Sequence, residues 1–280
     1  MVRCKAFLLV ICLWIPVVAF PQGSARGLRA VVVQGAMPSE TEKLVSRLEN
    51  VCFEEIGGWK FWRGTVDGYP VILSRTLKGI ANAAAATAIA IERYYPIAII
   101  NQGTAGGLEP SLQLFDIVLG TSSVSLGAFK TPYRPAGGGS NSLDWRPLNL
   151  LASEGSAGND PNRHTIARFA GDSVLLSVAR RVAPLHTRGR MVEGIIGSSD
   201  MWNDEFGRIA RFHKEFGATV EEMETASAAQ IAGLFRVAFL GIRVVSDNTT
   251  NGEAYQSETG DACQDFVFEV VKANVEHLAR

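Results

Sequence analysis

The sequence predicts a single α/β domain in which a mostly parallel β-sheet is covered by helices on both faces. Runs of apolar and β-branched residues, typical of strands, alternate along the chain with segments of helical periodicity. Residues 239–245 are apolar almost throughout, as expected of a strand that is buried on both faces of a parallel sheet. The 280 residues could hold two average domains, but no linker divides them. We therefore expect one domain over residues 28–280.

The first half of this domain contains clear signals for strands and helices. Residues 28–34 are apolar and predict a strand. Ser39 followed by Glu42 matches a capping box, which predicts a helix over residues 39–48. Asp67 and Gly68 form a typical hairpin turn between two strand-like segments. The elements expected after the first helix are strands at 59–66 and 69–76, an alanine-rich helix at 81–94, and strands at 97–101 and 116–121.

The second half begins with a region of weak structural signals. Residues 131–161 are rich in Pro, Gly and Ser and predict no regular structure. The chain then returns to alternating periodic segments. The elements expected there are a helix at 173–183, strands at 192–197 and 239–245, and a long amphipathic helix at 261–278.

Two acidic segments predict a ligand site. Small and apolar residues recur at helical spacing after Glu222, and Glu221, Glu222 and Glu224 crowd the expected first turn, where carboxylates suit the positive end of the helix dipole. Asp247 follows the strand at 239–245 in a polar loop. Because ligands of open α/β sheets bind beyond the carboxyl ends of strands, we expect a pocket that carries carboxylates. Taken separately, the segments also fit a dipole-stabilised helix start and a capped turn.

Five motifs in chain order carry a resemblance to a known family. Glu-Met-Glu at 222–224 and Arg-Val-Val-Ser-Asp at 243–247 resemble the 5′-methylthioadenosine/S-adenosylhomocysteine nucleosidases of the nucleoside phosphorylase superfamily. The other motifs are Gly-Ala-Met-Pro-Ser-Glu at 35–40, Asn-Gln-Gly-Thr-Ala-Gly-Gly at 101–107 and Gly-Ser-Ser-Asp-Met-Trp at 197–202. The resemblance runs from residue 28 to the C-terminus, apart from a divergent stretch at about 121–168. It implies a three-layer αβα domain with a central mixed, mostly parallel sheet, a homodimer, and no metal or organic cofactor.

The resemblance assigns the cleavage of an N-glycosidic bond to three residues. The site of such an enzyme must protonate the purine and deliver a nucleophile to an electron-poor sugar. Asp247 matches the family's general acid at purine N7, with Ser246 placed to orient it. Glu40 matches the glutamate that activates the attacking water. Pro38 and Ser39 replace two glutamates of the family motif, which leaves Glu40 as the candidate base there.

Further residues are candidate substrate contacts on the same grounds. Glu224 matches the acceptor of both ribose hydroxyls, and Met223 would pack under the sugar. Trp202 would stack on the purine, although an ordinary core position would also explain an indole there. The set is completed by Thr104 in the glycine-rich loop and by the motif residues Glu222 and Arg243, with Ser199 and Asp200 as weaker candidates for contacts to the base.

One residue bears on the choice between hydrolysis and phosphorolysis. Phosphorylases of this superfamily place an arginine just ahead of the glycine-rich loop to hold phosphate, and this chain has Asn101 there. With Glu40 available for water, the leading hypothesis is hydrolysis of adenine nucleosides such as 5′-methylthioadenosine and S-adenosylhomocysteine. A phosphate-dependent purine nucleoside phosphorylase and a non-catalytic nucleoside-binding or storage-type protein stay open. For the pocket around the 5′ substituent, the divergent stretch offers Phe129, Tyr133 and Trp145 as candidate lining residues.

Charge and composition favour a small-molecule substrate. The formal net charge of -1 and the pI of about 6.4 give no basic surface for nucleic acid. The 4 histidines are scattered without metal-ligand spacing, so we expect no metal site. Cys52 and Cys263 would remain after removal of a signal peptide, and they either pair or stay as buried free thiols, the second being favoured.

The first residues of the chain predict export. Basic residues precede an apolar run at 6–20, which is short for a membrane span and typical of a secretory signal. We expect a signal peptide over residues 1–25, with cleavage after Ala19 or Ala25, and a periplasmic or secreted protein without stable membrane association. An uncleaved anchor is the alternative.

Overall fold

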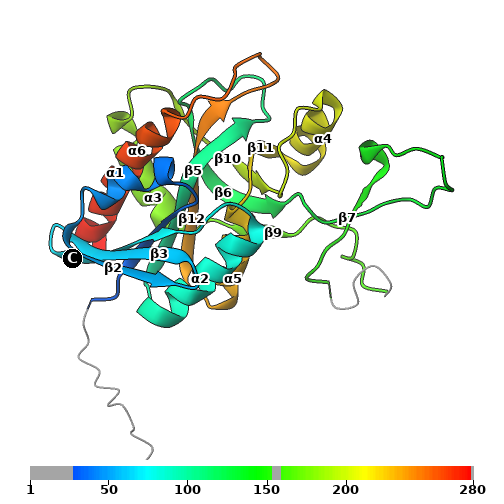
Figure 1. Cartoon of the computed structure of the whole chain (residues 1–280). Helices are drawn as coiled ribbons and strands as arrows, with labels where there is room; N and C mark the ends of the chain where they lie inside the picture. Colours follow the sequence, from blue (N-terminus) through cyan, green and yellow to red (C-terminus); the bar gives the residue numbers. More distant parts are fainter. Residues whose placement is uncertain (1–27, 153–158, 279–280) are drawn as a thin grey trace, which may run out of the picture.

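The structure of the chain, a computed structural model, describes residues 28–152 and 159–278 (Figure 1). The expected signal peptide at 1–25 lies outside the described residues. Among the described helices, none combines the length and the hydropathy needed to cross a membrane. All of the candidate site residues fall inside the described ranges.

A 10-stranded sheet forms the centre of the molecule. Its strands are β1 (Val31–Gly35), β2 (Glu49–Ile56), β3 (Trp59–Val66), β4 (Tyr69–Arg75), β5 (Ala98–Gly107), β6 (Ile117–Ser125), β9 (Arg168–Ala170), β10 (Met191–Ser198), β11 (Ala218–Glu222) and β12 (Ala238–Asp247). They follow the spatial order β11, β10, β6, β12, β5, β1, β4, β3, β2, and β9 pairs with β6 beside this path.

Parallel and antiparallel pairs are combined in this sheet. β5 lies between β1 and β12 and is parallel to both, and β10 is parallel to β6 and β11. β12 is antiparallel to β6, and β11 is antiparallel to the end of β5. The expected mixed sheet is thus confirmed, but parallel pairs do not predominate in it, since five of its described strand pairs are parallel and five are antiparallel. The second pairing of β11 brings its end next to the ends of β5 and β12, where the candidate residues lie.

Helices cover both faces of the sheet and give three layers (Figure 1). They are α1 (Glu42–Val45), α2 (Ile80–Tyr94), α3 (Ser173–Val182), α4 (Phe206–Phe216), α5 (Thr225–Leu234) and α6 (Thr259–Leu278). Val31 and Val33 of β1 pack in one core with α1, α3 and α6, whereas Val32 packs in the other core with α2 and α5. Alternating side chains of one strand therefore serve opposite layers, as the unbroken apolar runs predicted.

The expected hairpin between residues 59–66 and 69–76 is confirmed. β3 and β4 pair in antiparallel register, with Val66 opposite Tyr69. Asp67 and Gly68 between them have φ angles of 50° and 76°. Two consecutive positive φ angles define the type of two-residue turn that matches the twist of the flanking strands.

The helix expected at 39–48 is shorter and begins differently. The chain forms a 3-10 turn over Pro38–Glu40 with Met37 at its N-cap, and α1 then begins at Glu42 with Thr41, rather than Ser39, at the N-cap position. The carboxylate of Glu40 turns back and accepts hydrogen bonds from the amides of Ala36 and Met37. This segment is therefore shaped around Glu40. β2 follows it and was not predicted, because most of its side chains are exposed and show no apolar alternation.

The acidic cluster at 221–224 is divided between a strand and a helix. Glu221 and Glu222 end β11 instead of opening a helix, which corrects the expectation. α5 begins at Thr225, with Glu224 at its N-cap position. Strand pairing with β10 and β5 outweighs the local helical pattern here. Strand β12 likewise extends to Asp247, which therefore belongs to the strand and not to the loop beyond it. Helix α4 was not predicted from the sequence.

The described part of the region at 131–161 extends away from the body of the molecule (Figure 1). Where it is described it is mostly irregular, as expected, with a small hairpin of β7 (Phe129–Lys130) and β8 (Arg146–Pro147) at its base. Arg211 of α4 attaches it by donating hydrogen bonds to the carbonyl oxygens of Ser142 and Trp145. The region therefore contributes little to the central core.

The two cysteines of the domain do not pair with each other. Cys52 and Cys263 are both free, but only Cys263 is buried, so the expectation of buried thiols is wrong for Cys52. Within residues 28–152 and 159–278, no group of His, Cys, Asp and Glu side chains is arranged to hold a metal ion.

Candidate active site

A cavity of about 340 Å³ opens where β1, β5, β11 and β12 end. Ligand sites at the carboxyl ends of strands are the rule in open α/β sheets. Of the nine catalytic and substrate-binding residues expected from the sequence, all but Arg243 line this cavity: Glu40, Thr104, Trp202, Glu222, Met223, Glu224, Ser246 and Asp247. Residues from five separate parts of the chain are thus brought together as expected.

Glu40 is held in place by four hydrogen-bond donors. Its Oε2 accepts from the amides of Ala36 and Met37 at 2.9 and 3.1 Å. Its Oε1 accepts from the amide and the hydroxyl of Thr104 at 2.8 and 3.0 Å. A Cβ at Gly103 would lie 2.5 Å from Oε1, so the close approach of this carboxylate requires a glycine there. The glycine-rich segment thus directs its donors at Glu40.

Asp247 stands at the end of β12 with a hydroxyl beside it. Ser246 donates a hydrogen bond to Oδ1 of Asp247 at 2.7 Å. Burial raises the pKa of Asp247 above its ordinary value, although the hydrogen bond from Ser246 acts in the opposite direction. The exposed carboxylate of Asp204 adds to the rise by repulsion. Asp247 therefore holds a proton more readily than an exposed aspartate does.

Beneath the cavity, Glu222, Arg243, Ser198 and Asn101 form a buried network, which we call the ion-pair floor. Arg243 donates to Glu222 through both Nε and Nη2, and its Nη2 also donates to the Asn101 side chain. Ser198 donates its hydroxyl proton to Glu222. Burial alone would raise the pKa of Glu222, but Arg243 and the hydrogen bonds lower it below its ordinary value.

The place of Arg243 corrects the expectation that it contacts substrate. Its side chain is 1% exposed and does not line the cavity. It lies beneath Glu222 and balances that charge in the ion-pair floor. Glu222 itself reaches the cavity but is engaged with Arg243, so its role is to support the site.

Glu224 has a different environment, although it is only two residues from Glu222. Its Oε1 accepts the amide proton of Gly79 at 3.0 Å, and its Oε2 is 3.9 Å from Nη2 of Arg243. Burial, followed by repulsion from Glu222, raises the pKa of Glu224 to about 8. Glu224 therefore holds a proton more readily than an exposed glutamate does.

Glu221 is a further buried carboxyl of the cavity that the family motifs did not single out. It accepts hydrogen bonds from the side chains of Ser199 and Asn203. Burial raises its pKa as well. We call Glu221, Glu224 and Asp247 the acid wall, because all three line the cavity and have a raised pKa.

Trp202 lies at the mouth of the cavity and is 64% exposed, which rules out the ordinary core position. Its ring meets that of Tyr255 edge to face, with 5.7 Å between the centroids. Tyr255 was not predicted, because it lies in the polar loop after β12, where nothing in the sequence marks it. Other lining residues missed from the sequence are Met37, Lys78 and Asn203.

Several weaker candidates do not line the cavity. Ser199 supports Glu221, and Asp200 accepts the amide proton of Ile80 at the start of α2. Tyr133 is 91% exposed, and the remaining two aromatic candidates pack against α4: Phe129 stacks on Phe212, and Trp145 lies by Arg208. None of these three aromatic residues lines the cavity of this chain as the structure describes it.

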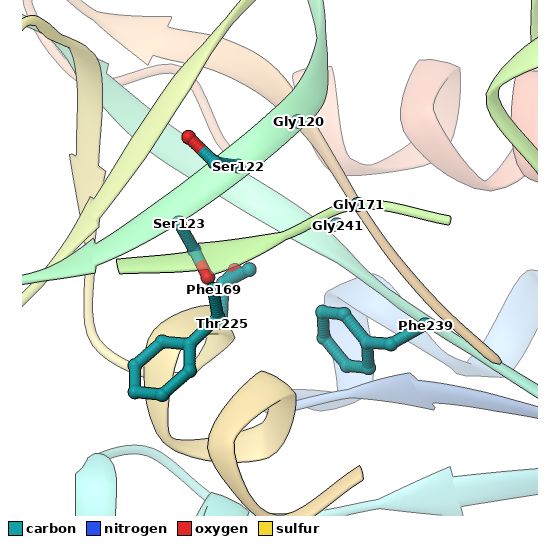
Figure 2. A pocket seen from close by; sticks show the side chains of 8 residues that line it. All are labelled: Gly120, Ser122, Ser123, Phe169, Gly171, Thr225, Phe239 and Gly241. Carbon is teal, nitrogen blue, oxygen red and sulfur yellow. The ribbon is translucent and has the colours of Figure 1, made fainter. Parts of the chain in front are cut away.

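A second, narrow crevice runs between β6, β9 and β12 (Figure 2). Its lining consists of glycines, small polar side chains and the rings of Phe169 and Phe239, and a Cβ at Gly171 would lie 2.3 Å from the carbonyl oxygen of Gly120. The crevice results from this close approach of strands and is too narrow for a ligand. Catalytic chemistry therefore belongs to the larger cavity.

Comparison with known proteins agrees with this geometry. The family model described as the phosphorylase superfamily matches residues 30–278. A protein of Bacillus thuringiensis (strain Al Hakam) named 5′-methylthioadenosine/S-adenosylhomocysteine nucleosidase is 30% identical over 222 residues, which cover 78% of this chain and 85% of that protein. A protein of Bacillus anthracis with the same name shows the same identity and coverage.

Solved structures give the same picture. The 5′-methylthioadenosine/S-adenosylhomocysteine nucleosidase of Neisseria meningitidis in complex with methylthio-immucillin-A is 28% identical, with a TM-score of 0.71, and the match covers 88% of this chain and 99% of that one. The futalosine hydrolase of Helicobacter pylori has a TM-score of 0.70 at 21% identity, covering 88% and 98% of the two chains, which is a likeness of fold alone.

Proposed function

The chain belongs to the phosphorylase superfamily, and we propose that within it the protein is a nucleosidase that hydrolyses the N-glycosidic bond of adenine nucleosides. 5′-Methylthioadenosine and S-adenosylhomocysteine are the proposed substrates, since the relatives at 30% identity carry both in their names. Adenine and the free sugar would be the products. The acid wall and Glu40 supply the groups that this reaction needs.

Two residues divide the proton transfers of the proposed reaction. The bond between C1′ and N9 breaks, and its electron pair goes to the purine. Asp247 donates its proton to N7 of the leaving base. Glu40 accepts a proton from a water molecule as the water oxygen bonds to C1′. Release of that proton from Glu40 to solvent and uptake of a proton by Asp247 restore the site, so that overall the elements of water are divided between sugar and base. Ser246 orients Asp247 through its hydrogen bond.

The remaining residues hold the nucleoside. Glu224 accepts the ribose hydroxyls, which are neutral donors that suit a carboxyl in a buried place. Met223 packs under the sugar, and Trp202 provides an exposed indole face for the purine. Thr104 aligns Glu40 by donating two hydrogen bonds to it.

The position of Glu40 is the observation that favours hydrolysis over phosphorolysis. Glycine-rich loops with free amides attract phosphate. Here the amide and hydroxyl of Thr104 are both donated to the Glu40 carboxylate. Asn101 stands ahead of the loop, is buried, and accepts a hydrogen bond from Arg243. A negative charge on the loop repels a phosphate dianion but assists the deprotonation of water.

Incubation with a panel of purine and pyrimidine nucleosides in phosphate-free buffer tests this proposal. We expect release of adenine from 5′-methylthioadenosine and S-adenosylhomocysteine without any added cofactor, and none from pyrimidine nucleosides. A nucleoside that stays bound and uncleaved would instead indicate a binding or storage protein, and release only after phosphate addition would indicate a phosphorylase.

We further propose that the protein is exported and forms a homodimer. Export is supported by the apolar run at 6–20. Dimerisation is supported by the resemblance to dimeric nucleosidases and by exposed apolar side chains on the extended region, namely Tyr133, Leu143, Leu150 and Leu151. Cell fractionation with N-terminal sequencing of the mature chain, and analytical ultracentrifugation, test the two points. A cytosolic full-length chain or a monomer at micromolar concentration would contradict them.

A further inference from the structure

Glu221 is a buried carboxyl of the cavity that the proposed reaction leaves without a task. Gly106 of β5 pairs with Asp247 of β12 on one side and with Glu221 of β11 on the other. Side chains of paired residues project to the same face of a sheet, and two strand spacings amount to about 9.5 Å. Asp247 and Glu221 therefore stand on the same face, with a glycine between them, and both line the cavity.

The absent side chain at Gly106 leaves room for a flat ring between these carboxyls. A Cβ at Gly106 would lie 3.1 Å from Oδ2 of Asp247 and would narrow that space. A purine over Gly106 with N7 at Asp247, as the proposed function requires, extends its six-membered ring toward Glu221. N1 and the 6-amino group are the hydrogen-bonding atoms of that ring that face away from the sugar.

The partners of Glu221 leave it able to bind a ligand. Ser199 donates to Oε1 at 2.6 Å, and Asn203 donates to Oε2 at 2.5 Å. A carboxyl group offers about four lone-pair positions, so Ser199 and Asn203 leave part of its hydrogen-bonding capacity unused. Burial raises the pKa of Glu221 and favours the neutral acid, which can donate as well as accept. Asn203 follows Trp202 directly in the chain, so its hydrogen bond to Glu221 links that carboxyl to the segment that carries the indole proposed to stack on the purine.

We propose that Glu221 is the base-recognition residue of this site, donating a hydrogen bond to N1 of adenine and accepting one from the 6-amino group. This assignment rests on the proposed function, since it requires a purine held between Trp202, Asp247 and Glu221. A purely structural Glu221, which only positioned Ser199 and Asn203, would affect every purine alike.

A double-mutant cycle, in which one change is made in the Glu221 side chain and the other at N1 of the substrate, distinguishes base recognition from a purely structural role. We would measure kcat/KM for 5′-methylthioadenosine and for its 1-deaza analogue, in which a C–H replaces N1, with the wild type and with Glu221→Leu and Glu221→Gln. The wild type should lose about 10-fold to 100-fold on the analogue. Glu221→Leu should lose a similar factor on the natural substrate and little more on the analogue. Glu221→Gln, which keeps a donor and an acceptor, should retain most of the discrimination.

The outcomes separate this assignment from the function on which it depends. If the losses from Glu221→Leu and from the analogue multiply in full, Glu221 does not contact N1 and the assignment is wrong. Thermal unfolding of each variant shows whether the fold is retained, and Glu221→Gln provides the comparison should the leucine variant not fold. A wild type that releases no adenine from either compound would overturn the proposed function itself, a result that needs no variant.

Discussion

The ion-pair floor and the acid wall contain buried carboxyls in opposite states. Burial raises the pKa of all of them, yet only Glu222 ends below its ordinary value, because Arg243 and Ser198 stabilise its charge. Among the described residues, Glu221 and Asp247 form no ion pair, and Glu224 reaches Arg243 only at 3.9 Å. For Glu222, the ion pair and the hydrogen bonds thus outweigh burial, whereas for Glu221 and Glu224 burial outweighs the attraction of Arg208 and Arg243.

The two regions divide the work of the site accordingly. The floor is satisfied by its own partners and fixes the backbone of β11, β12 and the start of α5. The wall keeps unused hydrogen-bonding capacity, which a sugar acceptor requires, and Asp247 has a raised pKa, which a proton donor to a leaving base requires.

The largest effect is expected from Asp247→Asn in the acid wall. The variant keeps the shape of the side chain but cannot donate a proton from a carboxyl, so kcat should fall by about 10²-fold to 10⁴-fold. The free energy of unfolding should stay nearly unchanged, because no ion pair is broken. Adenine release measured by chromatography and urea unfolding check both points. Asp204→Asn, the same change at the exposed neighbour, is the matched control and should remain close to wild type; equal losses in both variants would remove Asp247 from its role.

Arg243→Met should have the next largest effect, on stability. It leaves Glu222 buried without its cation, which costs about 3–5 kcal/mol in comparable cases. Urea unfolding of the variant measures this loss. Adding Glu222→Gln to Arg243→Met removes the uncompensated charge and should recover part of it. A single variant as stable as the wild type would mean that the floor contributes no stability.

Glu224→Gln should change how stability depends on pH. The pKa of Glu224 is raised to about 8 in the folded chain, so its contribution to stability is fully present below its ordinary value of about 4.3 and is lost as pH rises through 8. The variant should therefore gain on the order of 1–3 kcal/mol relative to wild type as pH rises from 4 to 9.

The contribution of Glu222 to stability changes with pH in the opposite direction. Its lowered pKa contributes stability that is present above its ordinary value and is lost as pH falls. Relative to wild type, Glu222→Gln should thus lose stability at pH 7 and regain it in acid. Denaturant unfolding at a series of pH values measures both variants, and parallel pH profiles for the two would contradict the assigned states.

The central strands could be predicted from the sequence, and the edges could not. The apolar runs of β1, β5 and β12 are long enough to mark buried strands. β2 carries mostly exposed side chains, and the end of β11 looks helical because residues beyond it belong to α5. Pairing with strands distant in the chain decides both cases, and no local pattern records it.

The candidate site was predictable where short motifs specify chemistry. Glu40, Glu224 and Asp247 carry such motifs, and the fold brings them to one cavity. The position of Arg243 under Glu222 depends on how β12 and β11 are placed, so its supporting role could not be derived from its motif. Tyr255 lies in the loop after β12, lines the cavity and contacts Trp202. This contact joins residues that are distant in the chain, so no local sequence pattern predicts it.

In the proposed mechanism, Glu40 directs water, and not phosphate, to C1′. The most direct measurement is the identity of the sugar released from 5′-methylthioadenosine in phosphate buffer, determined by mass spectrometry. The free sugar, formed at a rate that does not depend on phosphate concentration, is the predicted result. A sugar 1-phosphate formed in proportion to added phosphate would contradict it.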